Sequence, residues 1–441
     1  MSFIVFAVLL VAGILLAALN LEGAKSGEVG GLGCVVMVVA LLLGGVAGYG
    51  VGDRSRDARM VPAWEIEADL PASLEGKGMW MAGDSVVRVR SDGAVAYGMD
   101  GRVRWKYGLQ GAQVVCMMSP NAGGGAGVGL IGYAEEDKPC RQVVALDTAT
   151  GKVLWKRVLG EFVHSFSLIG VLAVASEAAV LPAADGVRAF DPRSGKELWK
   201  ARAKRGCAFE PAEDELGISA GRLAVVWRCK KRVLLESIDV TTGKPIWSVP
   251  VPGQRKIETV SVLSAEPAVI RVREKGEGGD DRILAFTGDA EPSGVIPVTG
   301  REGRIPFDDP SFPLVHGMSV QVRNGMIYAL RDRDRDVDNM MTAYGLDGRP
   351  LWSRTWDMGQ VDAFSVQDDG IVLVYEGYKG HPDRVTVLDL RTGEDTSSHH
   401  LYDNSYYFGS FPAWTHRHHG LTLVATPASG SPLVAYRKDK D

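Results

Sequence analysis

An acidic run near residue 335 is the part of the sequence that most resembles a metal-binding motif. Its carboxylates stand at alternate positions: Asp332, Asp334, Asp336 and Asp338. Oxygen ligands spaced two residues apart can converge on one Ca²⁺ ion. The run has no glycine for the sharp turn of a calcium loop, and Arg333 and Arg335 offset its charge. We therefore expect a solvated loop whose charges pair with one another, with a calcium site as the alternative.

Histidines form a second candidate site near the C-terminus. Five of the eight histidines lie between residues 399 and 419. On a strand, His416 and His418 would share one face, as two metal ligands must. No cysteine accompanies them, and Asp403 is the carboxylate nearby. We expect exposed histidines at a strand end, and a metal site is again the alternative.

Four cysteines fall into two pairs within the repeated part of the chain. Cys116 and Cys140 are 24 residues apart, and Cys207 and Cys229 are 22 residues apart. Cys207 is expected to start one strand and Cys229 to end the next, antiparallel strand, which would bring them side by side. This phasing predicts two disulfides, which form in oxidising compartments. Buried free thiols are the alternative.

Other chemistry is not indicated. The sequence has no G-x-S-x-G elbow of a serine nucleophile, and its glycine-rich run at 123–127 lies between expected strands rather than before a helix. A net charge of −5 over 441 residues gives no basic surface for nucleic acid. We expect a protein without catalytic residues and without a nucleic-acid partner, and an enzyme remains an open alternative.

These side chains must be positioned by a unit that recurs along the chain. A small residue followed by a large apolar one returns at intervals of 44 to 58 residues. The large residues are Tyr97, Leu146, Phe190, Ile238, Phe286, Tyr344, Leu388 and Tyr436. A period of this size indicates one supersecondary unit repeated.

Each clear copy of the repeat encodes a β-hairpin. An apolar run enters an Asp-x-x-[Ser/Thr]-Gly turn, in which Asp bonds to nearby amides and Gly takes a positive φ. The Asp and Gly residues are Asp147 and Gly151, Asp191 and Gly195, Asp239 and Gly243, and Asp389 and Gly393. The tryptophans that mark the strand after the turn are Trp64, Trp105, Trp155, Trp199, Trp247 and Trp352. We expect these indoles as apolar wedges between neighbouring sheets.

Two further apolar runs per repeat bring the unit to four strands, which is typical of a β-propeller blade. The last repeat stops after its third strand. Residues of about 62–69, with Trp64, look like the missing fourth strand. The sequence therefore predicts an all-β, eight-bladed propeller over residues 62–441, in which residues 62–69 complete the last blade and protect its edge.

The repeats resemble those of the PQQ-like repeat family, whose propellers carry an aLDxxTGkxxW signature, over roughly residues 62–438. The resemblance implies the propeller fold. Its quinoprotein dehydrogenases use an adjacent Cys-Cys pair, which this chain lacks, so we expect no PQQ, no other cofactor and no dehydrogenase activity. Its non-catalytic members, such as the outer-membrane assembly lipoprotein of Gram-negative bacteria, imply a docking platform in a membrane complex.

The N-terminal 52 residues have a different composition. Residues 3–20 and 30–51 are apolar runs, each near the ~20 residues that span a bilayer. We expect a two-helix transmembrane hairpin over residues 1–52 and a tether over 53–61, with a cleaved signal peptide as the alternative reading of the first run.

Two signals disagree about the side of the cell membrane on which the propeller lies. Arg54, Arg56 and Arg59 follow the second apolar run, and by the positive-inside rule they place the propeller in the cytoplasm. The paired cysteines favour an oxidising compartment instead. We favour the extracytoplasmic side.

Together these features predict a membrane-anchored propeller that binds or scaffolds a protein partner without catalysis. The alternative is a ligand sensor or metal-assisted enzyme with its site in the central funnel of the propeller.

Overall fold

The computed structural model describes thirteen stretches of the chain. They are residues 59–66, 76–136, 138–159, 171–209, 216–219, 221–288, 291–307, 319–332, 339–356, 361–375, 383–402, 414–425 and 433–439.

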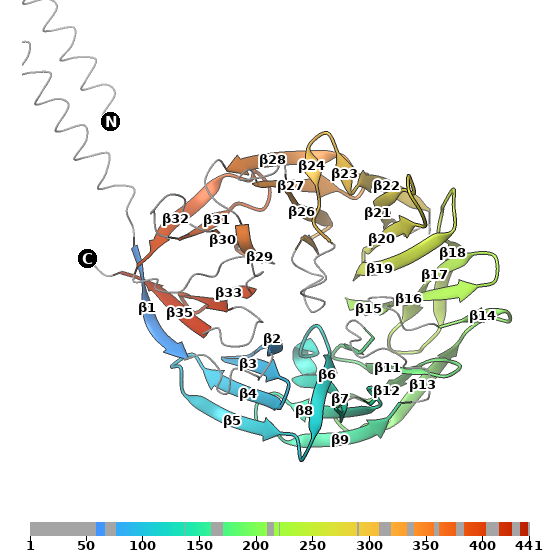
Figure 1. Cartoon of the computed structure of the whole chain (residues 1–441), viewed down its shortest axis with the longest axis horizontal. Coiled ribbons are helices and arrows are strands. Elements are labelled where there is room, and N and C mark those ends of the chain that lie inside the picture. Colours follow the sequence, from blue (N-terminus) through green and yellow to red (C-terminus); the bar gives the residue numbers. More distant parts are fainter. Residues whose placement is uncertain are drawn as a thin grey trace, which may run out of the picture.

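The described strands form a closed ring of blades around a central axis (Figure 1). Most blades have four strands, whereas blade 4 has five and blade 6 has six. Blade 1 contains β2 (Gly76–Ala82), β3 (Ser85–Arg90), β4 (Gly93–Gly98) and β5 (Val103–Gly108). Blade 2 contains β6 (Gln113–Met118), η1 (Gly124–Ala126), β7 (Val128–Glu135), β8 (Gln142–Asp147) and β9 (Val153–Val158). Blade 3 contains β10 (Ala173–Val174), β11 (Ala179–Ala183), β12 (Gly186–Phe190) and β13 (Glu197–Arg202). Blade 4 contains β14 (Cys207–Ala208), β15 (Leu216–Ser219), β16 (Arg222–Cys229), β17 (Val233–Asp239) and β18 (Pro245–Pro250).

The second half of the ring repeats this order. Blade 5 contains β19 (Ile257–Ala265), β20 (Ala268–Glu274), β21 (Asp281–Phe286) and β22 (Pro292–Pro297). Blade 6 contains β23 (Thr299–Gly300), β24 (Gly303–Arg304), β25 (Val320–Arg323), β26 (Met326–Asp332), β27 (Asn339–Gly345) and β28 (Pro350–Trp356). Blade 7 contains β29 (Val361–Gln367), β30 (Gly370–Tyr375), β31 (Arg384–Leu388) and β32 (Asp395–Leu401). Blade 8 contains β33 (Trp414–His418), β34 (Leu421–Ala425), β35 (Leu433–Lys438) and β1 (Arg59–Ile66).

The ring closes through the first described strand. β1 pairs antiparallel with β35, with Met60 opposite Lys438 and Ile66 opposite Leu433. The predicted closing segment is thus in place, and its strand begins at Arg59, three residues before position 62. The start of β1 also pairs in parallel with β32, so blades 7 and 8 form one continuous sheet.

The predicted fold class needs one correction. It placed a transmembrane helical hairpin before the propeller, whereas the regular elements of the described chain are all strands apart from the three-residue 3-10 turn η1. Among the described residues, no helix is long and apolar enough to cross a membrane. The apolar runs 3–20 and 30–51 lie outside the described residues. Their hydropathy alone does not specify a helix, and the fold that the structure supports is all-β.

The repeated small residue lies directly across from the repeated tryptophan. Ala145 is the cross-strand partner of Trp155, and a β-bulge follows at Leu146. The same register and bulge recur in other blades, as between Ala189 and Trp199. The small side chain leaves room beside the indole, and the bulge twists the outer strand.

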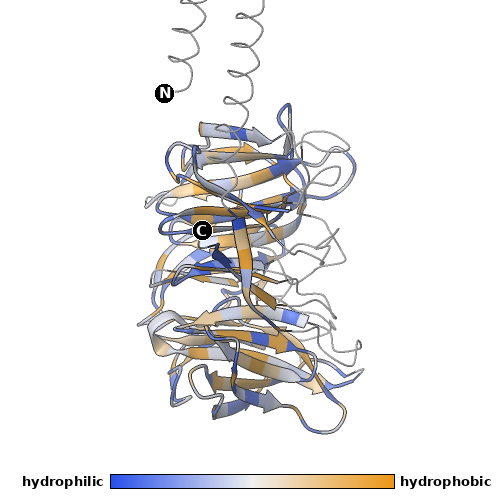
Figure 2. Ribbon diagram, turned by 90° about the vertical axis from the view of Figure 1, so that its left-hand side faces the viewer, coloured by the Kyte–Doolittle hydropathy of each residue, from blue (hydrophilic) through white to orange (hydrophobic). Residues whose placement is uncertain are grey.

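The apolar cores lie between blades. Trp155 of blade 2 packs in one cluster with Ala179 and Phe190 of blade 3. The middle strands are almost wholly buried, as in β4 and β30, whereas the outer strand β9 exposes most of its residues. Figure 2 shows the apolar residues along the strands inside the disc and hydrophilic residues at many of the turns.

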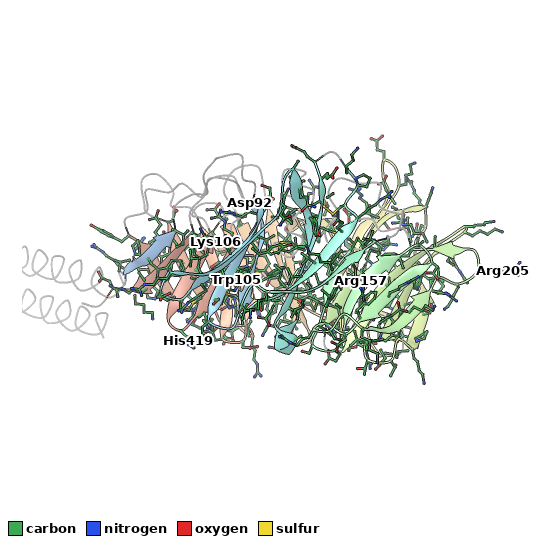
Figure 3. The ribbon with its side chains drawn as sticks, turned by 90° about the horizontal axis from the view of Figure 1, so that it is seen from below. Asp92, Trp105, Lys106, Arg157, Arg205 and His419 are labelled. Atoms are coloured by element: carbon green, nitrogen blue, oxygen red, sulfur yellow. A yellow bond between two sulfur atoms is a disulfide. The ribbon has the colours of Figure 1, made fainter. Side chains whose placement is uncertain are left out.

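Strand direction decides which turns share a face of the disc. Within a blade the strands alternate in direction, so the first and third turns of every blade lie on one face, which we call the inner-hairpin face. Asp84 in the first turn of blade 1 and His419 in the first turn of blade 8 lie there. Figure 3 shows His419 and Asp92, a second-turn residue, on opposite faces.

Candidate functional site in the central channel

A cavity of about 840 Å³ occupies the centre of the ring. Its walls come from the first strands of the blades, which run beside the axis. The lining strands include β2, β15, β19, β25, β29 and β33. A volume of this size is within the range of small-molecule pockets.

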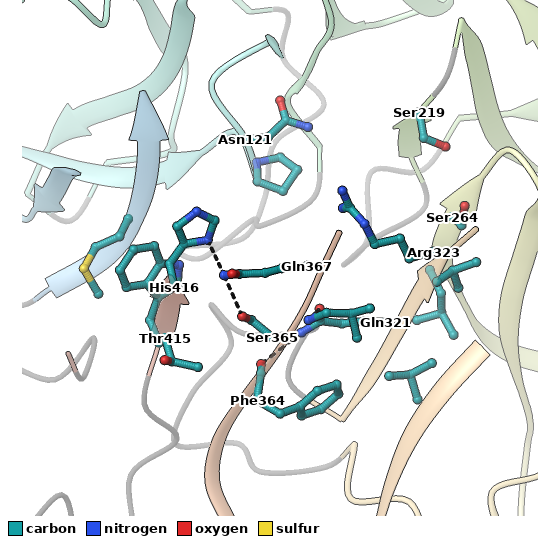
Figure 4. Close-up of a pocket in the computed structure, with 18 of the residues that line it drawn as sticks. Asn121, Ser219, Ser264, Gln321, Arg323, Phe364, Ser365, Gln367, Thr415 and His416 are labelled. Carbon is teal, nitrogen blue, oxygen red and sulfur yellow. Dashed lines mark hydrogen bonds between the residues drawn. The ribbon is translucent and has the colours of Figure 1, made fainter. Parts of the chain in front are cut away.

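Amide side chains bond neighbouring inner strands to one another along the wall. Gln321 of β25 donates from Nε2 to the Phe364 carbonyl at 3.0 Å (Figure 4). Its Oε1 accepts from the Val366 amide at 2.8 Å, and both partners are in β29. Gln367 of β29 in turn accepts from the Arg417 amide of β33 at 3.2 Å. These amides act as clamps between blades 6, 7 and 8.

His416 is the most perturbed titratable group of the cavity wall. Because Gln367 Oε1 accepts from Arg417, its Nε2 faces His416 and donates to Nδ1 at 2.8 Å, which places the ring proton on Nε2. Trp414 stacks on the imidazole, with ring centroids 5.8 Å apart. Burial, assisted by the nearby His418, lowers the pKa of His416 to about 4. The imidazole is therefore neutral at neutral pH.

Charged side chains at the inner-hairpin mouth pair across blade boundaries. Arg323 bonds through Nε to Asp368 Oδ1 at 3.1 Å, and Arg417 reaches Asp369 at 3.0 Å. In these two pairs, each carboxylate has an arginine from a neighbouring blade. These two pairs thus join blade 7 to blades 6 and 8 at this mouth of the cavity.

The rings of the predicted pair His416 and His418 are neighbours, with centroids 6.4 Å apart, but they contact different partners. His416 points to Gln367, whereas His418 Nε2 lies 2.9 Å from Asp84 Oδ1 of blade 1. His419 Nε2 lies 3.0 Å from the same oxygen. The hydrogen bonds from His418 and then His419 lower the pKa of Asp84 below its usual value. Sequence reasoning missed Asp84, which no local motif marks.

The predicted acidic loop is described only at its start. Asp332 ends β26, and burial raises the pKa of its carboxyl while Arg304 opposes the change. Asp334, Asp336 and Asp338 lie outside the described residues. A calcium site there stays a prediction.

The predicted disulfides are confirmed. Cys116 bonds to Cys140, and Cys207 bonds to Cys229. Cys207 and Cys229 are register partners on β14 and β16. Each bridge lies within one blade, and its two cysteines are 24 or 22 residues apart in the chain, so neither bridge joins adjacent cysteines.

The turns and tryptophans take the predicted places. Asp147 Oδ1 accepts from the Thr150 amide at 3.0 Å and hydroxyl at 2.9 Å, and Gly151 has a φ of 71°. Five of the six indoles then pack on the turn glycine of the next blade. The pairs are Trp64 with Gly101, Trp105 with Gly151, Trp155 with Gly195, Trp199 with Gly243, and Trp352 with Gly393. Trp247 differs, because it stacks on Phe286.

This repeated blade agrees with a family model described as outer membrane protein assembly factor BamB. The model matches residues 92–299 and, in an overlapping match, 183–407. The chain belongs to this family of PQQ-like repeat propellers. No curated protein matches the chain.

Several solved propeller structures are similar to this chain in fold. BamB from Moraxella catarrhalis is 12% identical, with 86% of this chain and 99% of that chain covered and a TM-score of 0.49. A europium-containing methanol dehydrogenase is 12% identical, with 86% and 93% covered and a TM-score of 0.51. The Dos1 propeller is 11% identical, with 86% and 96% covered and a TM-score of 0.50. At these identities the likeness shows the fold alone.

Proposed function

We propose that this propeller is a non-catalytic scaffold that binds a protein partner through its outer rim. The observation that carries the proposal is a set of large apolar side chains on the outer strands of six consecutive blades, each between 42% and 54% exposed. This apolar rim consists of Val103, Val153, Leu198, Ile246, Val295 and Leu351.

The rim suits a protein partner for two reasons. Its side chains lie on β5, β9, β13, β18, β22 and β28, the outer strands of six blades that follow one another around the ring. Each of these strands is also the last of its described sheet and has one edge without a strand partner. Exposed edges and apolar side chains are the features that an added strand or a docking surface uses. The family model's description as an outer membrane assembly factor supports the same role.

Photo-crosslinking tests the rim directly. A benzoylphenylalanine at Leu198 or at Ile246, in the full chain in its native host, should give the same adduct with one protein on irradiation. The matched control is Glu266, an exposed residue in the turn between β19 and β20, away from the outer strands. The proposal fails if the rim positions give no adduct, or if Glu266 gives the same one.

The disulfides support an extracytoplasmic location, because such bonds persist in oxidising compartments. Thiol labelling of intact cells, followed by mass analysis with and without reductant, tests this location. All four propeller thiols should resist labelling until reductant is added, and free labelling at the start would place the propeller in the cytoplasm. Attachment to the cell membrane stays a prediction.

A ligand-sensing role is the second candidate, and the central cavity with its neutral His416 favours it. A small molecule bound there should raise the melting temperature of the native chain and not that of His416→Gln. Gln321, Gln367 and Asp368 favour the scaffold role, because their side chains make hydrogen bonds between blades and so stabilise the ring.

A further inference from the structure

We propose that Asp84, His418 and His419 form a binding site for a divalent transition-metal ion that links the first and last blades. One ligand atom from each residue lies within 4.8 Å of the other two. Asp84 is in the turn between β2 and β3 of blade 1, and the two histidines are at the turn between β33 and β34 of blade 8. The cluster therefore sits across the ring closure.

The backbone at His419 explains how two consecutive histidines reach one carboxylate. On an extended strand, adjacent side chains point to opposite faces. His419 has a φ of 48°, in the left-handed region that a non-glycine residue seldom adopts. This turn brings the two rings to a centroid distance of 4.0 Å, with both Nε2 atoms on Asp84 Oδ1. The strained turn thus converges two imidazoles on the same point.

The ligand set selects the class of ion. Two imidazole nitrogens and one carboxylate oxygen suit Zn²⁺ and its transition-metal neighbours, whereas Ca²⁺ and Mg²⁺ prefer oxygen alone. Ligand atoms around a tetrahedral zinc with bonds of ~2.0 Å lie about 3.3 Å apart. The present Nε2–Oδ1 separations of 2.9 and 3.0 Å need to open by only a few tenths of an ångström.

The three side chains are exposed enough for an ion to reach them. The side chains of Asp84 and His419 are 75% and 67% exposed, and that of His418 is 25% exposed. An ion could therefore enter from solvent and keep water at its remaining position. Arg417, which directly precedes His418, carries a positive charge on the same face. That charge is already paired with the carboxylate of Asp369.

Metal titration of the untagged full chain tests the site. Zn²⁺ should bind with one equivalent per chain in calorimetry, and Co²⁺ should give the visible absorption of a nitrogen- and oxygen-ligated ion. The bound ion should also raise the melting temperature, because it binds the folded ring and not the separated blades. Absence of saturable binding at millimolar Zn²⁺ would overturn the proposal.

Variants assign the binding to these residues. Asp84→Asn and His419→Asn should each weaken Zn²⁺ binding at least roughly tenfold. Mutation of a residue that only holds a metal ligand in place already weakens metal affinity by about this factor. Asparagine tolerates the left-handed backbone at position 419, so the turn is retained. The matched control, Asp369→Asn, removes a carboxylate from the neighbouring inner hairpin and should bind Zn²⁺ like the native chain. Binding that Asp84→Asn leaves intact would show that the ion sits elsewhere.

Discussion

The indole of Trp155 in blade 2 lies against the backbone of Gly195 in blade 3. Its Nε1 donates to the carbonyl of Pro192 at 2.8 Å, and a Cβ at position 195 would lie 2.6 Å from the indole Cγ. The outer strand of one blade is thus docked on the turn of the next. The same contact recurs with Trp105 and Gly151.

This contact predicts that Gly195→Ala destabilises the propeller by about 1–3 kcal/mol, because the methyl group meets both the indole and a φ of 68°. The matched control is Gly206→Ala, which has a φ of 81° and open space around its Cβ. It should lose only about 1 kcal/mol, from the backbone. Urea unfolding measures both, and equal losses would argue against the Trp155 contact.

Trp155→Ala should cost about 3–5 kcal/mol, because the indole is 7% exposed and fills an interblade core. Trp247→Ala should cost less, since that ring is half-buried and stacks on Phe286 without a turn glycine beneath it. Chemical unfolding of the two variants compares them. A loss below about 1 kcal/mol for Trp155→Ala would mean that the ring contributes little to the core.

Deletion of β1, residues 59–66, should lower the melting temperature more than Trp64→Ala does. The deletion removes every β1–β35 pair, whereas the substitution removes one side chain and its hydrogen bond to the Met99 carbonyl of blade 1. A peptide of residues 59–66 added in trans should restore part of the stability, and a scrambled peptide should not. A deletion variant that melts like the native chain would contradict closure by β1.

Acid should destabilise the propeller through its turn aspartates. The Thr242 hydroxyl lowers the pKa of Asp239, and the Ser194 amide lowers that of Asp191. A carboxyl group whose pKa is lower in the folded than in the unfolded protein stabilises the fold when it is ionised. This contribution is complete above the unfolded pKa, near 3.8. It is lost as the pH falls through the lower pKa of the folded state. Melting temperatures should therefore fall below about pH 4, and more steeply for the native chain than for Asp239→Asn. Parallel curves would exclude Asp239 as a contributor.

The blade could be predicted from the sequence because the residues that form its turns lie close together in the chain. Asp147, Thr150 and Gly151 make their turn within five residues, and the Ala145–Trp155 register follows from the hairpin. The pairing of Cys207 with Cys229 was predictable for the same reason, since the two face each other on neighbouring strands. The helical hairpin is the part of the predicted fold class that the described residues do not support, because a long apolar run measures hydropathy and not structure.

By itself, the amino-acid sequence determined the repeating unit, its turns, its wedge tryptophans and the need for a closing strand, since periodic residues encode each of these over short distances. Only the tertiary structure decided which side chains of different blades meet. Asp84 contacts His418 and His419 across 334 and 335 positions of sequence, and Gln367 holds His416 across 49. Such contacts depend on how the ring closes and on the backbone turn at His419, and neither leaves a pattern in neighbouring residues.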